Sequence, residues 1–216
     1  MADAALDNDV ILKGASYGVL AELLAALPDG PYAHGVLGAA RFMLPKKLAR
    51  KTVVRMDGAI RDLQTALDAF EVLEPDETEQ RLAAELQFNA QQASQALDAG
   101  EAQLAAMVVT RELRHLLTGD KRAIAALALT PLPVSIDRNQ LAHKLICFEQ
   151  AVWSLLDHQD TASIRAAICA EREVDTQLRI CFSCSAPEVE EPSWREGLRS
   201  AIEEVRAGCP YLLAMI

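Results

Sequence analysis

Three acidic residues stand where a strand is expected to end or a helix to begin, and carboxylates at such positions can bind a metal ion. Asp7 follows the apolar residues 4–6, and Asp120 comes soon after the strand candidate 114–118, which contains Leu116 and Leu117. Glu101 opens the predicted helix that leads into the second of these segments. Because the carboxyl ends of parallel strands share one edge of a sheet, we expect the three carboxylates to converge there.

Carboxylates that crowd together repel one another unless a cation neutralises them, and their hard oxygen atoms suit Mg²⁺ or Mn²⁺. A metal ion held in this way can bind a phosphate oxygen and lower the pKa of a bound water. The pattern therefore predicts a site for phosphodiester hydrolysis. Each acid taken singly is more often a helix cap than a metal ligand, so only the joint pattern favours this chemistry.

The charge of the chain is acidic overall but reverses locally. The 216 residues carry a formal net charge of −10, which excludes a protein that coats nucleic acid non-specifically. Residues 41–55 nevertheless hold six basic residues and no acid: Arg41, Lys46, Lys47, Arg50, Lys51 and Arg55. A solvated surface that pairs with nearby acids is the simpler interpretation, and a phosphate-binding patch for nucleic acid is the alternative.

Hydrophobic periodicity predicts alternating strands and helices over the first two thirds of the chain. We expect strands at 3–7, 69–73 and 114–118, and helices over 10–27, 35–44, 57–68, 76–97, 101–113 and from 121. Such alternation is typical of an α/β fold with a mainly parallel sheet between helices. An all-helical adaptor is the alternative, and it requires the segments 3–7 and 114–118 to be helical.

The last third of the chain has a different character, because no strand signal is evident after about residue 138. A strongly apolar helix is expected over 141–156. Shorter helices are expected over 161–171, 173–182 and 193–207. We therefore divide the chain into a domain of residues 1–137 and a C-terminal helical extension of residues 138–216.

Three segments together resemble the motifs of PIN-domain nucleases, especially the bacterial toxin-type branch. Residues 6–13 are similar to the opening motif, residues 97–102 to a helix start with Gly-Glu-Ala, and residues 116–122 to a strand that ends in Thr-x-Asp. The resemblance covers about residues 3–135. It implies a three-layer α/β/α sandwich that uses Mg²⁺ or Mn²⁺. The site residues that it implies are Asp7, Glu101 and Asp120 as metal ligands, Thr118 near the metal or its water, and Asn8 or Asp9 in support.

The chain departs from the family pattern in one respect. Most members carry a further acid on an early helix, whereas residues 38–44 contain none. Glu77, Glu79 or Glu85 could substitute from a later helix, and Glu85 is the best candidate because it lies between apolar neighbours.

The function expected from this resemblance is a nuclease that acts on RNA rather than DNA, as a toxin or defence component. An antitoxin or another protein partner and a homodimer are implied with it. The alternative is a catalytically degenerate PIN-like scaffold that binds a partner protein through residues 138–216. The missing early acid and the net charge of −10 favour that alternative.

Location and cysteine chemistry are also open to prediction. No apolar run approaches the roughly 18 uncharged residues of a membrane span, and the acidic N-terminus lacks the basic start of a signal peptide. We expect a cytoplasmic protein whose five cysteines are reduced. Cys181 and Cys184 could bind zinc with His143 and Cys147, or be buried thiols, which is the commoner role.

Overall fold

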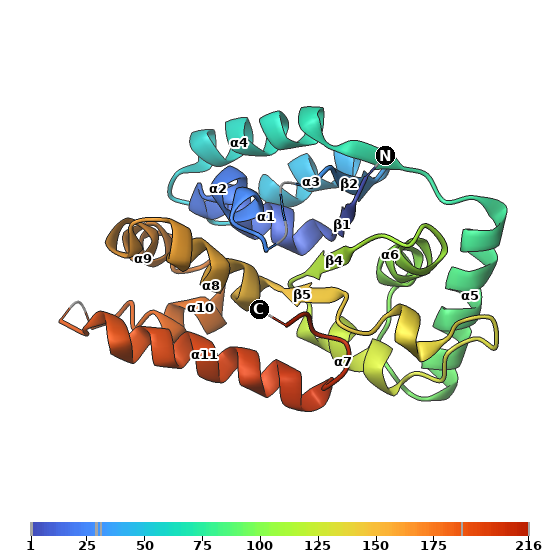
Figure 1. Ribbon diagram of the computed structural model, residues 1–216. Coiled ribbons are helices and arrows are strands. Elements are labelled where there is room, and N and C mark those ends of the chain that lie inside the picture. Colours follow the sequence, from blue (N-terminus) through green and yellow to red (C-terminus); the bar gives the residue numbers. More distant parts are fainter. Residues whose placement is uncertain (1, 29, 31, 187, 216) are drawn as a thin grey trace.

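The computed structural model describes residues 2–28, 30, 32–186 and 188–215. Its centre is a five-stranded sheet in the order β3-β2-β1-β4-β5, and every neighbouring pair is parallel. The strands are β1 (Ala4–Leu6), β2 (His34–Leu37), β3 (Glu71–Leu73), β4 (His115–Thr118) and β5 (Leu145–Cys147). Helices lie on both faces of the sheet (Figure 1), so the α/β fold and its three layers are confirmed.

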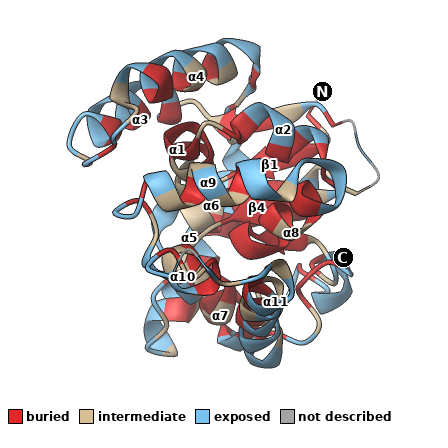
Figure 2. Ribbon diagram, turned by 90° about the vertical axis from the view of Figure 1, so that its left-hand side faces the viewer, coloured by how far each residue is buried: buried red, intermediate tan, exposed pale blue. Residues whose placement is uncertain are grey.

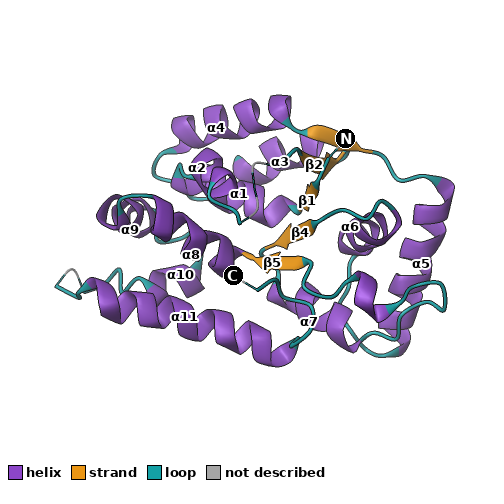
Figure 3. Cartoon of the chain, in the orientation of Figure 1, coloured by secondary structure: helices purple, strands orange, loops and turns teal. Residues whose placement is uncertain are grey.

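Each face of the sheet carries its own group of helices (Figure 3). On one face lie α1 (Asn8–Tyr17) and α8 (Phe148–His158), with α2 (Leu20–Ala25), α3 (Ala40–Leu48), α4 (Met56–Ala69) and α9 (Thr161–Ala170) around them. On the other lie α6 (Ala99–Thr110) and α7 (Lys121–Leu129), and α5 (Glu77–Gln92) packs on α6. The remaining helices are α10 (Thr176–Cys181), α11 (Glu191–Gly208) and the short 3₁₀ helix Arg138–Gln140.

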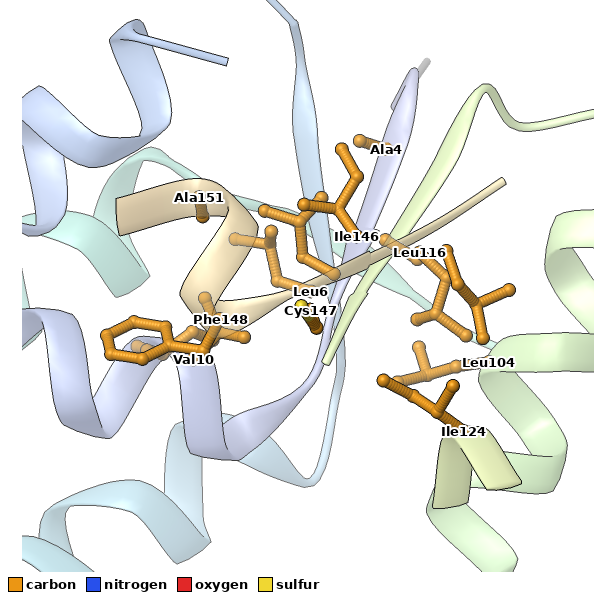
Figure 4. Close-up of a cluster of buried hydrophobic side chains, with 14 of the residues drawn as sticks. Ala4, Leu6, Val10, Leu104, Leu116, Ile124, Ile146, Cys147, Phe148 and Ala151 are labelled. Carbon is orange, nitrogen blue, oxygen red and sulfur yellow. The ribbon is translucent and has the colours of Figure 1, made fainter. Parts of the chain in front are cut away.

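The strands are apolar because both faces of the sheet are buried. Figure 4 shows side chains of the sheet, such as Ile146, between Val10 of α1 on one side and Ile124 of α7 on the other. These three residues have no exposed surface. Burying an aliphatic side chain of this size contributes about 1.5–3 kcal/mol, so the stacked layers hold the strand ends in place. Figure 2 shows the complementary pattern, with exposed residues on the outer helices α4 and α11.

Two predicted helices near the N-terminus are wrong in part. The expected helix 10–27 is two helices, because Gly18 ends α1 in the left-handed conformation at φ 74°. The expected helix 35–44 begins only at Ala40, since residues 34–37 form β2. Gly35 permits this close strand packing, because a Cβ there would lie 2.7 Å from Leu73 Cγ.

The expected helix 141–156 is also wrong in its first part. Residues 145–147 form β5, which pairs with β4 through Leu117 and Ile146, and α8 begins only at Phe148. The C-terminal segment then runs beside β5, where the Ala214 amide donates to the Leu145 carbonyl at 2.7 Å. Residues 138–216 are therefore not purely helical, and a division after residue 137 would separate β5 from its sheet.

The expectation of reduced cysteines is contradicted by a disulfide between Cys169 and Cys184, whose Cα atoms lie 5.0 Å apart. Cys147, Cys181 and Cys209 are free and buried. The bond removes Cys184 from the proposed zinc set, and His143 instead contacts the Leu213 carbonyl. The sequence spacing suggested that Cys181 and Cys184 act together. In the structure, α9 packs against α10 and brings Cys169, not Cys181, into bonding distance of Cys184.

Within the part of the chain that the structure describes, no helix has the length and apolar character needed to cross a membrane.

Candidate metal and nucleic-acid site

A pocket of about 420 Å³ opens at the carboxyl ends of the strands, and we call it the acidic pocket. Five carboxylates line it, namely Asp7, Asp9, Asp98, Glu101 and Asp120. Asp7 follows β1 and Asp120 lies two residues beyond β4, and these strands are neighbours in the sheet. The predicted convergence of Asp7, Glu101 and Asp120 around one site is therefore what the fold produces.

Asp7 caps α1, and its carboxylate accepts from the backbone amide of Asn8 at 2.7 Å and from that of Asp9 at 3.4 Å. The buried Thr118 hydroxyl lies 3.4 Å from Asp7 Oδ2 and accepts from the Asp120 amide at 3.2 Å. Thr118 thus ties the two acids together. Burial raises the pKa of Asp7 above its ordinary value, although the Asn8 amide opposes this shift.

Glu101 lies at the start of α6 and forms a capping box with Asp98. The Glu101 amide donates to Asp98 Oδ1 and the Asp98 amide donates to Glu101 Oε2, both at 2.8 Å. Burial raises the pKa of Glu101 to about 7, and the negative charges of Asp98, Asp120 and Asp7 add to the shift. Asp98 was not predicted as a site residue, although the spacing Asp-x-x-Glu before an apolar run is a recognisable capping signal.

The other two acids already have cationic partners. Asp120 caps α7 and accepts from the Arg122 amide and the Arg122 guanidinium, both at 2.8 Å, which lowers the pKa of Asp120. Asp9 Oδ2 lies 2.6 Å from Lys13 Nζ, which lies 2.6 Å from Asp175 Oδ2 as well. Lys13 and Asp175 were not predicted, and only the tertiary structure brings Asp175 beside α1.

The donor chemistry of the pocket suits a hard divalent cation, but the side chains are not arranged as a finished metal site. Among the described residues, no three acidic, histidine or cysteine side chains form a group that could hold an ion. Glu101 is engaged with Asp98, and Asp120 with Arg122. Burial, and to a smaller extent the negative charges of neighbouring acids, raises the pKa of Asp7 and of Glu101. A cation would offset both effects, so the pocket fits Mg²⁺ or Mn²⁺ in charge and donor type, provided that Asp120 gives up its pairing with Arg122.

The six basic residues of the predicted segment 41–55 have different surroundings in the structure. Lys47 and Lys51 line the acidic pocket, together with Met43 of α3. Lys46 and Arg50 are exposed. Arg41 donates to the Phe70 carbonyl at 3.4 Å.

Arg55 has a structural role, because its guanidinium donates to the Ala15 carbonyl at 2.7 Å and to Asp62 at 2.8 Å.

Glu85 does not supply the missing acid. Glu85 is exposed on α5 and lines a separate hollow with Arg81 and Gln140. Its apolar neighbours in sequence belong to the α5 face that packs on α6, and the Glu85 side chain lies outside that face.

Comparison of the chain with protein-family models, with curated proteins and with solved structures finds no match. Five carboxylates and two lysines line one concave surface, an arrangement that can hold a divalent cation and a phosphate group next to each other.

Proposed function

We propose that the chain is a PIN-like, metal-dependent nuclease that hydrolyses phosphodiester bonds, with RNA preferred over DNA. The observation that carries the proposal is the presence of opposite charges in one pocket: Lys47 and Lys51 share it with Asp7, Glu101 and Asp120. A site for an anionic substrate and a metal cation needs both signs of charge side by side. The preference for RNA comes from the family resemblance of the three motifs.

Asp7, Glu101 and Asp120 would hold Mg²⁺ or Mn²⁺. When bound, such an ion supplies charge neutralisation at phosphate and a water of lowered pKa. Thr118 keeps the Asp7 carboxylate and the Asp120 backbone in register. Lys47 and Lys51 bind the phosphate backbone of the substrate and orient it toward the acids.

Binding of bases is favoured by the exposed apolar residues beside these lysines. Phe42 is 75% exposed on α3, next to Met43 of the pocket wall. Lys46 follows Phe42 by one helical turn, so an aromatic face and a cation lie close together. Proteins that bind single strands combine such stacking surfaces with basic grooves.

The test is cleavage of mixed single-stranded RNA and DNA with Mn²⁺, with chelator as a control. Asp7→Asn and Asp120→Asn are expected to reduce the rate by a factor on the order of 10³, because each removes a ligand that supports several kcal/mol of charge stabilisation. Asp68→Asn, an exposed acid on α4 outside the pocket, should cleave like wild type. Equal cleavage by all proteins, or none by wild type, would contradict the proposal.

The second candidate function is a degenerate PIN-like scaffold that binds a partner protein through residues 138–216. It is favoured by the lack of a finished metal group among the described residues and by the exposed position of Glu85. Thermal unfolding with and without Mn²⁺ separates the two. An ion that binds only the folded state raises the melting temperature, whereas a scaffold without a metal site shows no shift.

The resemblance also leads us to propose a cytoplasmic toxin or defence protein that forms a homodimer and is bound by an antitoxin or another protein. The Cys169–Cys184 disulfide is more typical of an oxidising compartment, so the redox state of these cysteines in the cell tests the proposed location.

A further inference from the structure

Glu171, at the end of α9, is a buried acid with an unusual set of partners. The residue is only 2% exposed, yet both carboxylate oxygens are hydrogen-bonded. Oε2 accepts from the Val54 amide and Oε1 from the Arg55 amide, each at 2.7 Å. These amides immediately precede α4, where backbone donors lack helical partners and favour a negative charge. Charge-assisted bonds of this kind are about twice as strong as neutral ones.

The two amides held by Glu171 belong to the end of the basic segment 41–55. Arg55 continues the connection, because its guanidinium donates to the Ala15 carbonyl of α1. Asp7 caps that same helix. Glu171 and Arg55 together therefore fix the end of the basic segment relative to the helix that carries the acidic pocket. Lys51, which lines the pocket, precedes Val54 by only three residues.

The segment that carries Glu171 is itself well anchored. The Cys169–Cys184 disulfide closes the loop that contains it. Asp175 in the same loop is bonded to Lys13 of α1 at 2.6 Å, and the side chains of Asp175 and Lys13 are 9% and 12% exposed. A carboxylate on so constrained a loop can hold a neighbouring segment in one position, since few competing conformations are open to it.

We propose that Glu171 is a positioning residue for substrate binding: it holds the basic segment, and with it Lys47 and Lys51, against the acidic pocket. The inference rests on the proposed nuclease function. It gives residues 138–216 a part in that function, because the C-terminal helices supply the acid that orders the phosphate-binding side of the site. Glu171 does not touch the substrate and acts through the backbone of Val54 and Arg55.

The test compares Glu171→Gln with Glu79→Gln. The side-chain amide introduced by Glu171→Gln has one acceptor oxygen in place of two, so one of the two backbone donors loses its partner. Glu79 is a similarly buried acid at the start of α5, bonded to Arg111 and Thr110. It does not line the acidic pocket, and α5 lies on the other face of the sheet from the basic segment. Its substitution controls for general loss of stability. Glu171→Asp, which keeps the charge, should recover part of the effect.

Two measurements are made on the full chain: amide hydrogen exchange of residues 46–55, and fluorescence anisotropy of a labelled single-stranded RNA oligonucleotide in the presence of chelator. We expect Glu171→Gln to speed exchange over this segment and to weaken binding by about tenfold, which corresponds to the loss of one charge-assisted hydrogen bond. In cleavage assays KM should rise by a similar factor, while kcat stays within about twofold. Glu79→Gln should change neither the exchange of residues 46–55 nor the affinity.

Three results would overturn the inference. Unchanged exchange of residues 46–55 in Glu171→Gln would show that the carboxylate does not order the segment. Faster exchange with unchanged oligonucleotide affinity would show that the ordered segment is not used for binding. An equal loss of affinity in Glu79→Gln would reduce Glu171 to a general structural role. Failure of the proposed function is a separate result, because the wild-type protein would then not cleave the oligonucleotide, while the exchange and binding measurements would still report on the Glu171 contact.

Discussion

The Arg122 guanidinium holds the Asp120 carboxylate at the mouth of the acidic pocket, with Nη2 2.8 Å from Oδ2 and Nε 3.2 Å from Oδ1. The Arg122 side chain is 82% exposed and the Asp120 side chain 27% exposed. The exposed Arg122 side chain thus neutralises the charge of Asp120, an acid that the proposed metal site needs. Binding of a cation by Asp120 has to compete with this pair.

We therefore predict that Arg122→Gln increases the affinity for Mn²⁺ several-fold, because Asp120 loses its competing cation. Isothermal titration calorimetry on the protein without nucleic acid measures the affinity directly. Arg199→Gln serves as the control, since Arg199 is also exposed and paired with an acid, Glu196, on α11. An unchanged or lower affinity in Arg122→Gln would remove Asp120 from the metal site.

The raised pKa of Glu101 predicts a pH-dependent stability in the absence of metal. The unfolded chain ionises Glu101 near its ordinary pKa of 4.5, whereas the folded protein keeps the proton until about pH 7. Between these values the folded state binds more protons, so its free energy of unfolding falls as the pH rises. Glu101→Gln should abolish this loss and make the protein about 1–2 kcal/mol more stable than wild type at pH 8.

Urea unfolding at pH 5 and pH 8 measures the effect of Glu101→Gln. The substituted side chain keeps a carbonyl oxygen that can accept from the Asp98 amide, so the capping box is retained. Addition of Mn²⁺ at pH 8 should reverse the order of the two proteins, because only the wild-type carboxylate gains from the cation. Parallel pH profiles of the two proteins without metal would show that Glu101 does not titrate as its surroundings require.

Phe42 and Phe88 form a natural pair for testing the stacking surface. Both are exposed aromatic residues, at 75% and 59%, but only Phe42 lies on the helix that borders the acidic pocket. Phe42→Ala should weaken binding of a single-stranded oligonucleotide by about 5- to 100-fold, the effect of losing one stacked base. Phe88→Ala should leave affinity unchanged. If both substitutions have equal effects in an anisotropy titration, stacking on α3 is wrong.

The disulfide predicts a measurable contribution to stability. Cys169 and Cys184 are 15 residues apart, and closing a loop of that length restricts the unfolded chain by about 3 kcal/mol. The double variant Cys169→Ser/Cys184→Ser should therefore unfold at lower denaturant concentration. Thiol titration of the denatured, unreduced protein should find three free thiols, from Cys147, Cys181 and Cys209. Titration of all five cysteines would show that the bond does not form.

Much of the site was predictable from local sequence. Asp7, Glu101 and Asp120 each follow a short apolar segment or open a helix, and capping and strand endings are local signals. Because parallel strands must place their carboxyl ends together, the alternation of strands and helices was enough to predict that these acids meet. The same reasoning failed for Glu85, since the apolar neighbours of Glu85 show that one face of α5 is buried but not which other residues that face contacts.

The rest depended on contacts between segments far apart in the chain. The apolar residues of β5 would fit a buried helix equally well, and their pairing with β4 is what makes this segment a strand. Glu171 accepts a hydrogen bond from the Val54 amide, 117 positions away in the chain. Asp175 forms an ion pair with Lys13, which is also distant in sequence. The sequence by itself determined which residues cap helices, which form turns and which become buried, because those preferences act over a few residues. Tertiary packing decided which charges became neighbours, since a hydrogen bond or ion pair depends on distances in space that spacing along the chain does not encode.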